Sequence, residues 1–262
     1  MLHARSTDSS ESDPLFVTPQ KSKAPTIGHT NWQSQLIYSD KGKLIPTSLQ
    51  NNALFIEHHK SLEGVFRFNE FNLQIMVVSC PPWESEQDFT PHILCDNDIA
   101  NCSAYMERFG FTPVISRHHS AIMMAARKRS FHPLRDYFER IEWDGTPRLH
   151  NWLTYYLGAE KDKAEYLKFI GTKWMVAAVK RIYEAGCKFD HILVLEGAQG
   201  KGKSTALREL ATFDKDAVYF TDSVSILDIQ SKDAITACQG NIIVELAELA
   251  GFSKKDDQDI KR

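Results

Sequence analysis

The sequence has few cysteines, and they follow no recognisable spacing. Five occur in 262 residues, and none belongs to a C-x-x-C pair. Such scattered residues argue against a disulfide framework and against a zinc ribbon. The simplest prediction is a set of reduced thiols in a cytoplasmic protein. These residues are Cys80, Cys95, Cys102, Cys187 and Cys238.

Long apolar runs and a strong charge of either sign are also missing. No stretch is long enough to cross a bilayer, and the N-terminal "MLHARSTDSSESDPLF" lacks the apolar centre of a secretion signal. We therefore expect a soluble, intracellular protein without a membrane partner. The formal net charge is -3. This value excludes a global positive field, so that any surface for nucleic acid has to be a local patch.

The composition changes along the chain and predicts four regions. Residues 1–30 are rich in Ser, Pro, Asp and Lys, which predicts a disordered tail. In residues 31–130, short apolar runs such as "GVFRFNEF" and "NLQIMVVSC" alternate with turn signals, which predicts a small N-terminal α/β module. Within it, "DNDIANCSAYMERFG" predicts a helix with Asp96 or Asp98 as its N-cap.

Residues 131–189 predict a helical segment. Apolar residues recur at helical spacing after Pro133, and again after a "WDG" turn as far as Gly158. In that turn we expect the tryptophan to pack, the aspartate to cap and the glycine to bend the chain. A third helix is predicted from about Lys163 to Tyr183. Its second apolar face predicts burial on more than one side and consists of Met175, Val176 and Val179.

A glycine-rich stretch between an apolar segment and a helical one predicts a site for a nucleoside triphosphate. The pattern is Gly197-x-x-x-x-Gly202-Lys203-Ser204, with the predicted strand "HILVLE" before it and "STALREL" after it. Gly197, Gly200 and Gly202 allow successive N–H groups to turn inward, and the start of the helix adds positive dipole at the same point.

Each polar side chain of this stretch has a predicted role. Lys203 would neutralise the β- and γ-phosphates of ATP, and the Ser204 hydroxyl would bind Mg²⁺. Lys201 is either solvated or adds charge near the phosphates.

An acid at the end of another buried strand would complete such a site. In "NIIVELAEL", the apolar residues before Glu245 predict a short buried strand, and Glu248 follows one helical turn later. We expect Glu245 to hold the Mg²⁺ shell, and either acid to polarise an attacking water. Acids commonly follow apolar runs, however, and Glu248 is equally consistent with a solvated surface charge.

Several of these segments together resemble one family. "HPLRDYFERIEWDGTPRL", "YYLG", "GCKFDHILVLEGAQGKGKST" and "IIVELAEL" resemble the virulence-associated protein E family, P-loop ATPases of phages, prophages and mobile islands. "GVFRFNEF", from Gly64 to Phe71, resembles the N-terminal module of that family. The family is itself similar to superfamily 3 replicative helicases.

The resemblance implies an α/β fold in which a P-loop NTPase core, residues 190–262, follows the helical segment and the N-terminal module. It implies ATP-driven work on single-stranded DNA by a ring-forming homo-oligomer, or with a replication protein, in a bacterial or phage-infected cell. Phosphate binding would extend to Thr205. Lys203, Glu245 and Glu248 would be the catalytic residues.

The resemblance also implies that the core is incomplete. Related ATPases continue beyond "KKDDQDIKR" into a sensor strand and into an arginine that reaches the nucleotide of a neighbouring subunit. Without the sensor strand, "HILVLE" and "NIIVEL" would stay unpaired or pair directly. Nucleotide binding can survive this loss more easily than hydrolysis. The alternative function is a non-catalytic DNA- or protein-binding product with a vestigial nucleotide site.

One local basic patch is a candidate for binding DNA phosphates. It comprises the Arg127-Lys128-Arg129 run with Arg117, His118 and His119 nearby. A solvated charge run before the helical segment is an equally good interpretation.

Overall fold

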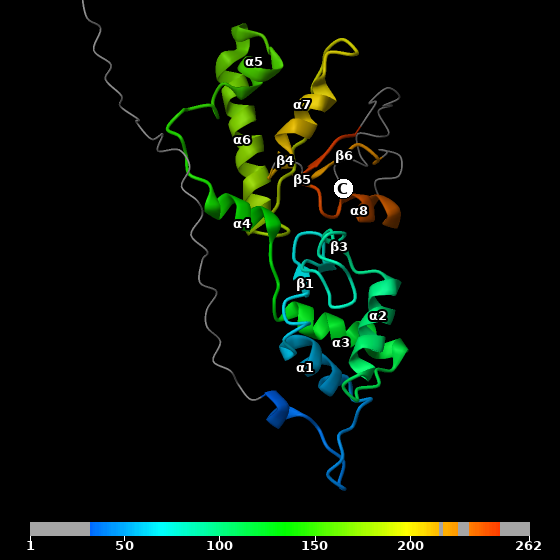
Figure 1. Cartoon of the computed structure of the whole chain (residues 1–262). Helices are drawn as coiled ribbons and strands as arrows, with labels where there is room; N and C mark the ends of the chain where they lie inside the picture. Colours follow the sequence, from blue (N-terminus) through cyan, green and yellow to red (C-terminus); the bar gives the residue numbers. More distant parts are fainter. Residues whose placement is uncertain (1–31, 215–216, 225–230, 247–262) are drawn as a thin grey trace, which may run out of the picture. The chain divides into compact units, whose positions relative to one another are not determined.

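A computed structural model describes residues 32–214, 217–224 and 231–246 (Figure 1). The predicted tail, residues 1–30, and Glu248 lie outside the described residues. The chain divides into a unit of residues Met1–Gln35 and a unit of residues Leu36–Arg262. In the first unit the structure describes a short 3-10 helix, η1 (Trp32–Gln35).

The N-terminal module, defined here as residues 36–131, contains three helices and one sheet. Its helices are α1 (Leu49–His58), α2 (Asp96–Glu107) and α3 (Ile115–Arg127). The sheet has the order β1–β2–β3 and is antiparallel throughout. Its strands are β1 (Phe66–Asn69), β2 (Gln74–Val77) and β3 (His92–Ile93). Mixed α/β structure is therefore confirmed.

The core of this module forms where α3 packs against α1 and β1. Phe55 of α1, Val77 of β2 and Ile122 of α3 are all buried there. Alternation along β1 and β2 explains part of this core, because successive side chains of a strand point to opposite faces. Met106 of α2 is buried as well.

The start of α2 differs from the sequence prediction. Its N-cap residue is Cys95 rather than Asp96 or Asp98. The Asp98 carboxylate accepts a hydrogen bond from the Cys95 N–H at 2.8 Å. The acid therefore satisfies the free N–H group at the helix start from the third helical position, as the second half of a capping box does.

The predicted helical segment forms three α-helices. They are α4 (Pro133–Arg140), α5 (Trp152–Leu157) and α6 (Ala164–Tyr183), with a 3-10 helix η2 (Lys161–Lys163) before α6. α5 ends at Gly158, which adopts the left-handed conformation with φ 68°. α5 and α6 approach closely at Gly171, where an added Cβ would lie 2.7 Å from Trp152 Nε1.

Two predictions about this segment are wrong. Val176 and Val179 of the second apolar face of α6 are 53% and 39% exposed, whereas Ala177 and Ile182 of the same helix are buried. In the "WDG" turn, Gly145 does bend the chain with φ 79°. Trp143, however, is 77% exposed instead of packed.

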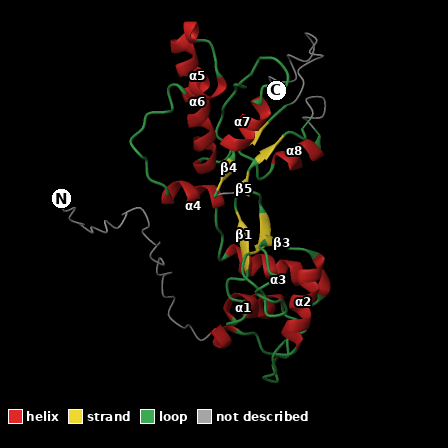
Figure 2. Ribbon diagram, turned by 45° about the horizontal axis from the view of Figure 1, so that its top comes forward, coloured by secondary structure: helices red, strands yellow, loops and turns green. Residues whose placement is uncertain are grey.

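Two small sheets and two helices follow among the remaining described residues, and Figure 2 shows them by type. α7 (Lys203–Leu210) precedes an antiparallel pair, β4 (Thr212–Phe213) with β5 (Ala217–Val218). α8 (Lys232–Cys238) lies between the parallel partners β6 (Phe220–Thr221) and β7 (Ile243–Val244). A small core of Ala211, Phe220 and Ile243 holds these elements together.

The predicted strand before the glycine-rich stretch is not formed. Residues 192–196 pair with no other strand among the described residues, and Ile192 and Val194 are 58% and 52% exposed. A strand requires partners for its backbone groups, whereas β6 and β7 pair with each other. Direct pairing of the two predicted strands is therefore not observed either.

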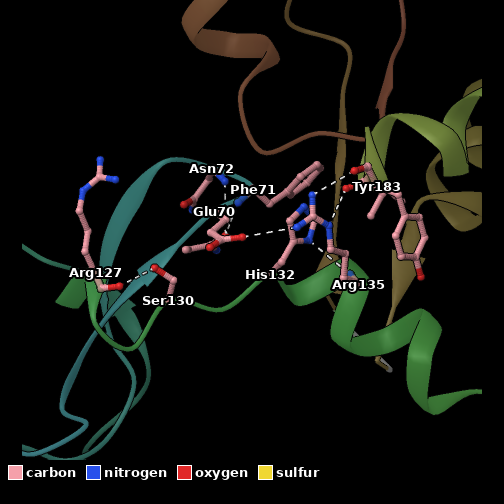
Figure 3. A network of polar contacts seen from close by, with 10 residues as sticks. Glu70, Phe71, Asn72, Arg127, Ser130, His132, Arg135 and Tyr183 are labelled. Carbon is pink, nitrogen blue, oxygen red and sulfur yellow. Dashed lines mark hydrogen bonds and ion pairs between the residues drawn. The ribbon is translucent and has the colours of Figure 1, made fainter. Parts of the chain in front are cut away.

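The side chain of Arg135 joins the module to the helices that follow it (Figure 3). Its Nε donates to the Ile182 carbonyl at 2.8 Å, and its guanidinium lies 3.6 Å from a Glu70 carboxylate oxygen. The His132 ring, at the start of α4, accepts a hydrogen bond from the Arg135 N–H at 3.2 Å. One arginine thus contacts the β1–β2 turn and the end of α6.

In the described parts of the chain, no helix combines the length and the apolar content that crossing a membrane requires.

Candidate functional site

The glycine loop, residues 197–202, is exposed and leads directly into α7. Gly200 and Gly202 both have φ 76°, a conformation that residues with a Cβ rarely adopt. Gly202 is also the N-cap of α7. The first N–H groups of α7 have no partner within the helix, as at any helix start, and they are available to an anion.

Lys203 folds back across this loop. Its ammonium donates to the carbonyl oxygens of Gly197 at 2.8 Å and Ala198 at 3.1 Å. An ammonium has three N–H donors, so that these two bonds leave one donor for a ligand. The loop carbonyls therefore hold a positive charge beside the free N–H groups of the helix.

The structure brings Ser204 and Glu245 together. The Ser204 hydroxyl donates to Glu245 Oε1 at 2.7 Å, although the two residues are 41 positions apart. Glu245 directly follows β7, and its N–H donates to the Thr221 carbonyl of β6 at 2.8 Å. Burial of Ile243 anchors the strand that carries this acid.

The second carboxylate oxygen of Glu245 is buried and has no hydrogen-bond partner in the described residues. An unpartnered buried anionic oxygen is unfavourable, and a cation would supply the missing interaction. Hydroxyl and carboxylate oxygens are ligands that Mg²⁺ accepts, and it commonly uses only one or two carboxylates with waters and phosphates. Ser204 and Glu245 thus fit Mg²⁺, although the described residues hold no group of three His, Cys, Asp or Glu side chains suited to a metal.

The other predicted site residues are less engaged. Lys201 and Thr205 are exposed, and their side chains make no hydrogen bond with the described residues. Their predicted contribution to phosphate binding stays a prediction. Glu248 lies outside the described residues.

Asp222 is a neighbouring acid that the sequence reasoning missed. It follows β6 as Glu245 follows β7, and the β6–β7 register places the two acids side by side. Its carboxylate lies 3.7 Å from the Arg208 guanidinium of α7. The signal was present in the sequence, because "VYFTDS" also runs from apolar residues into an acid.

Two residues of the predicted basic patch have structural partners, and a third is buried. Arg127 lies over the Phe68 ring at 4.3 Å, and Arg129 pairs with Glu63 at 2.6 Å. His118 is buried, and burial lowers its pKa to about 4, so that it is neutral at pH 7. Arg127 and Arg129 are thus engaged within the module, and the buried, neutral His118 ring is not available to DNA phosphates.

Comparison with protein families places these residues in a known domain. The family model of the virulence-associated protein E-like domain matches residues 138–262. Residues 138–262 are therefore similar to this domain. A search among curated proteins found no match to the chain.

The virulence-associated protein E-like domain begins within α4 and includes the glycine loop, Lys203, Ser204 and Glu245. The resemblance found in the sequence is therefore confirmed for this part of the chain. Gly64–Phe71 lies outside the matched range, and its likeness to the family's N-terminal module stays a prediction.

Proposed function

We propose that the glycine loop and α7 bind ATP with Mg²⁺, as part of a P-loop NTPase core that drives work on DNA during the replication of a phage or mobile element. The contact between the Ser204 hydroxyl and Glu245 Oε1, beside the Lys203 ammonium, carries this proposal. In the proposed site, the hydroxyl and the carboxylate would bind the metal ion, and the neighbouring Lys203 would bind the phosphates.

Each group would act on a different part of the nucleotide. Lys203 would turn a donor from the loop to the β- and γ-phosphate oxygens, where charge-assisted hydrogen bonds are strong. Ser204 and Glu245 would hold Mg²⁺, which supplies positive charge next to those phosphates when bound. Glu245 would also orient an attacking water, as a carboxylate can do in general base catalysis.

The part of the proposal that concerns DNA rests on the domain family. Phage and mobile-element ATPases that resemble this chain act on DNA, and we infer single-stranded DNA as the partner and a bacterial or phage-infected cell as the location. Hydrolysis would need an arginine from a neighbouring subunit of a homo-oligomer or from a replication protein.

Equilibrium binding of labelled ATP in the presence of Mg²⁺ tests the nucleotide site. We expect Lys203→Ala to weaken binding by at least about 100-fold, because a charged partner of the phosphates is removed. Lys188→Ala is the matched control, since Lys188 is exposed and, among the described residues, forms an ion pair with Asp190 alone. Equal ATP affinity of the Lys203→Ala variant and the wild type would rule out this site.

A second function, a non-catalytic binding protein with a vestigial nucleotide site, is favoured by the exposure of Ile192 and Val194. Exposed apolar residues before the glycine loop suit a protein partner better than a finished nucleotide-binding core. Single-stranded DNA binding by the Lys203→Ala variant, with and without ATP, separates the two. Nucleotide-driven function predicts that ATP changes DNA affinity in the wild type alone. An ATP-independent affinity in both proteins supports the binding protein.

A further inference from the structure

A polar hollow of about 340 Å³ lies between the β1–β2 turn and the residues that precede β6 and β7. It shares no residue with the glycine loop or with the Ser204–Glu245 contact. None of the described residues that line it is charged. Five carboxamide side chains contribute to its lining: Asn69, Asn72, Gln74, Gln239 and Asn241.

Some of these carboxamides already form hydrogen bonds within the protein, and those bonds determine which donors and acceptors remain for a ligand. The side-chain oxygens of Asn69 and Asn72 accept from the N–H groups of Phe71 at 2.9 Å and Gln74 at 3.1 Å. Their NH₂ groups remain as donors. The Asn241 NH₂ group donates to the Ala237 carbonyl at 3.0 Å, which leaves its oxygen as an acceptor.

The hollow therefore presents neutral donors and acceptors together. Among the described lining residues, a phosphate or a carboxylate would meet no cation, and an ammonium would meet no anion. The edge of a nucleobase carries the matching combination of donors and acceptors without charge.

Two aromatic rings add an apolar surface. Phe71 and Tyr219 line the hollow, with their ring centroids 5.6 Å apart and their planes at 73°. Aromatic side chains provide stacking surfaces for unpaired bases. The volume is within the range of small-ligand sites and exceeds the size of one base.

The walls of the hollow are held in place. Gly240 has φ 73°, and an added Cβ there would lie 2.9 Å from Asn72 Cβ, so that the two segments touch at a residue without a side chain. The turn that carries Asn72 also contains Leu73 at φ 59°. Figure 3 shows Arg135 tying the same turn, through Glu70, to the end of α6. A preformed site loses little conformational entropy on binding.

From these observations we propose that the carboxamide hollow binds one unpaired nucleobase. The inference deepens the proposed function, on which it rests for single-stranded DNA as the partner. β6 and β7 are parallel, and Tyr219 and Asn241 precede them whereas Glu245 follows β7. The hollow is thus at the opposite end of these strands from the Ser204–Glu245 contact, and it is a separate site.

Fluorescence anisotropy of the full chain with a labelled twelve-nucleotide DNA strand tests this inference. Gln74 and Gln239 are exposed, and their side chains form no hydrogen bond with the described residues, so that the double change Gln74→Ala and Gln239→Ala should leave the fold intact. We expect at least about a fivefold loss of affinity, because the double change removes two carboxamides that would hydrogen-bond the edge of the base. Gln87→Ala, an exposed glutamine of the same module, is the matched control and should bind as the wild type does.

An abasic strand of the same length separates bases from phosphates. We expect it to bind weakly and equally to the wild type and the double variant. Competition by free nucleosides identifies the source of the base. If free nucleosides displace the strand from the wild type but not from the double variant, the hollow binds free nucleosides. If they do not displace the strand from the wild type, the hollow binds a base that belongs to a strand. Unchanged DNA affinity in the double variant, or equal binding of normal and abasic strands by the wild type, would overturn the inference.

ATP binding, measured on the same variants, keeps the two proposals apart. The glutamine changes should leave ATP affinity unaltered, and Lys203→Ala should leave the base-dependent part of DNA binding in place. If Lys203→Ala loses ATP binding while the double variant binds DNA as the wild type does, only the proposal for the hollow is rejected. If Lys203→Ala keeps ATP binding while the double variant loses DNA affinity, only the nucleotide site is rejected.

Discussion

The N-terminal module and the virulence-associated protein E-like domain differ in how they are held together. The module has a three-stranded sheet covered by long helices, and Val77 and Ile122 are completely buried. In the domain, the described strands have two residues each, and the core of the glycine-loop region is the cluster around Phe220. Packing is thus concentrated in the module, whereas the candidate nucleotide chemistry belongs to the less buried region.

This difference has a physical basis. A loop that binds an anion has to keep its N–H groups and its lysine accessible, and the glycine loop is accordingly exposed. The module has no comparable requirement, so that even His118 is buried in it. Changes in the buried core of the module should therefore alter stability, and changes at the glycine loop should mainly alter ligand binding.

A core truncation in the module should have the largest effect on stability. Ile122→Ala removes a completely buried side chain between α1 and β1, and we expect a loss of about 2–5 kcal/mol in the free energy of unfolding. Urea denaturation measures it. Ile235→Ala in α8 is the counterpart, because Ile235 is largely exposed and should change stability by less than about 0.5 kcal/mol. Similar losses for both would remove the contrast between the regions.

The next effect is a pH dependence that originates in the module. Burial lowers the pKa of His118 to about 4, whereas the unfolded chain has the usual value of 6.5. The unfolded state then binds more protons between these two values, and stability falls as the pH decreases from 6.5 to 4. The full pKa shift of His118 corresponds to about 3 kcal/mol in the free energy of unfolding.

Replacement of this histidine isolates its contribution. Urea unfolding of His118→Leu at several pH values should show a weaker dependence than the wild type, whereas His119→Gln, at an exposed neighbouring position, should keep it. The pKa values of His59 and His132 are also lowered by burial, so that part of the dependence should remain. An unchanged slope in His118→Leu would contradict the burial of a neutral imidazole.

A smaller loss of stability is expected at the contact between α5 and α6. In Gly171→Ala, the new methyl group would approach Trp152 Nε1 to 2.7 Å and Leu153 Cδ1 to 3.0 Å. Overpacking costs about 1–3 kcal/mol, and the better helix propensity of alanine offsets about 1 kcal/mol of it. Thermal unfolding should show a lower Tm than for Lys168→Ala on the exposed face of the same helix. A higher Tm for Gly171→Ala would show that the two helices are not in close contact.

The smallest effect should come from a surface ion pair in the domain. Arg140 Nη2 lies 2.7 and 2.8 Å from the two carboxylate oxygens of Asp214, and both side chains are more than half exposed. Removing such a pair costs about 0–1 kcal/mol. Chemical denaturation of Arg140→Ala at low and high salt should show a small loss that salt diminishes. A loss as large as that of Ile122→Ala would mean that the domain depends on this pair for its packing.

Features set by local sequence were predictable. The observed α6, Ala164–Tyr183, nearly matches the predicted range, because its apolar periodicity extends over many turns. Pro133 likewise opens α4 as expected. The proximity of Glu245 to Ser204 was also predictable. The sequence places an acid at the end of a buried strand and a hydroxyl after a glycine loop, and both are expected at the same metal site.

Features that depend on distant neighbours were not predictable. Residues 192–196 are apolar enough for a strand, yet pairing is decided by what lies beside them. The exposure of Val176 has the same cause, because periodicity indicates an apolar face without indicating what covers it. The carboxamide hollow combines Asn69–Gln74 with Tyr219 and Gln239–Asn241, which only tertiary packing brings together.

The central claim is that Ser204 and Glu245 together hold Mg²⁺. The most direct test is to measure how Mg²⁺ changes ATP affinity in Ser204→Ala, Glu245→Gln and the double variant. Asp233→Asn in α8 is the control. In calorimetric titrations we expect Mg²⁺ to strengthen ATP binding in the wild type and in the control. Each single change should remove most of this gain, and the double change should remove little more, because both residues would serve one cation. A gain that persists in both single variants, or losses that simply add, would contradict a shared metal site.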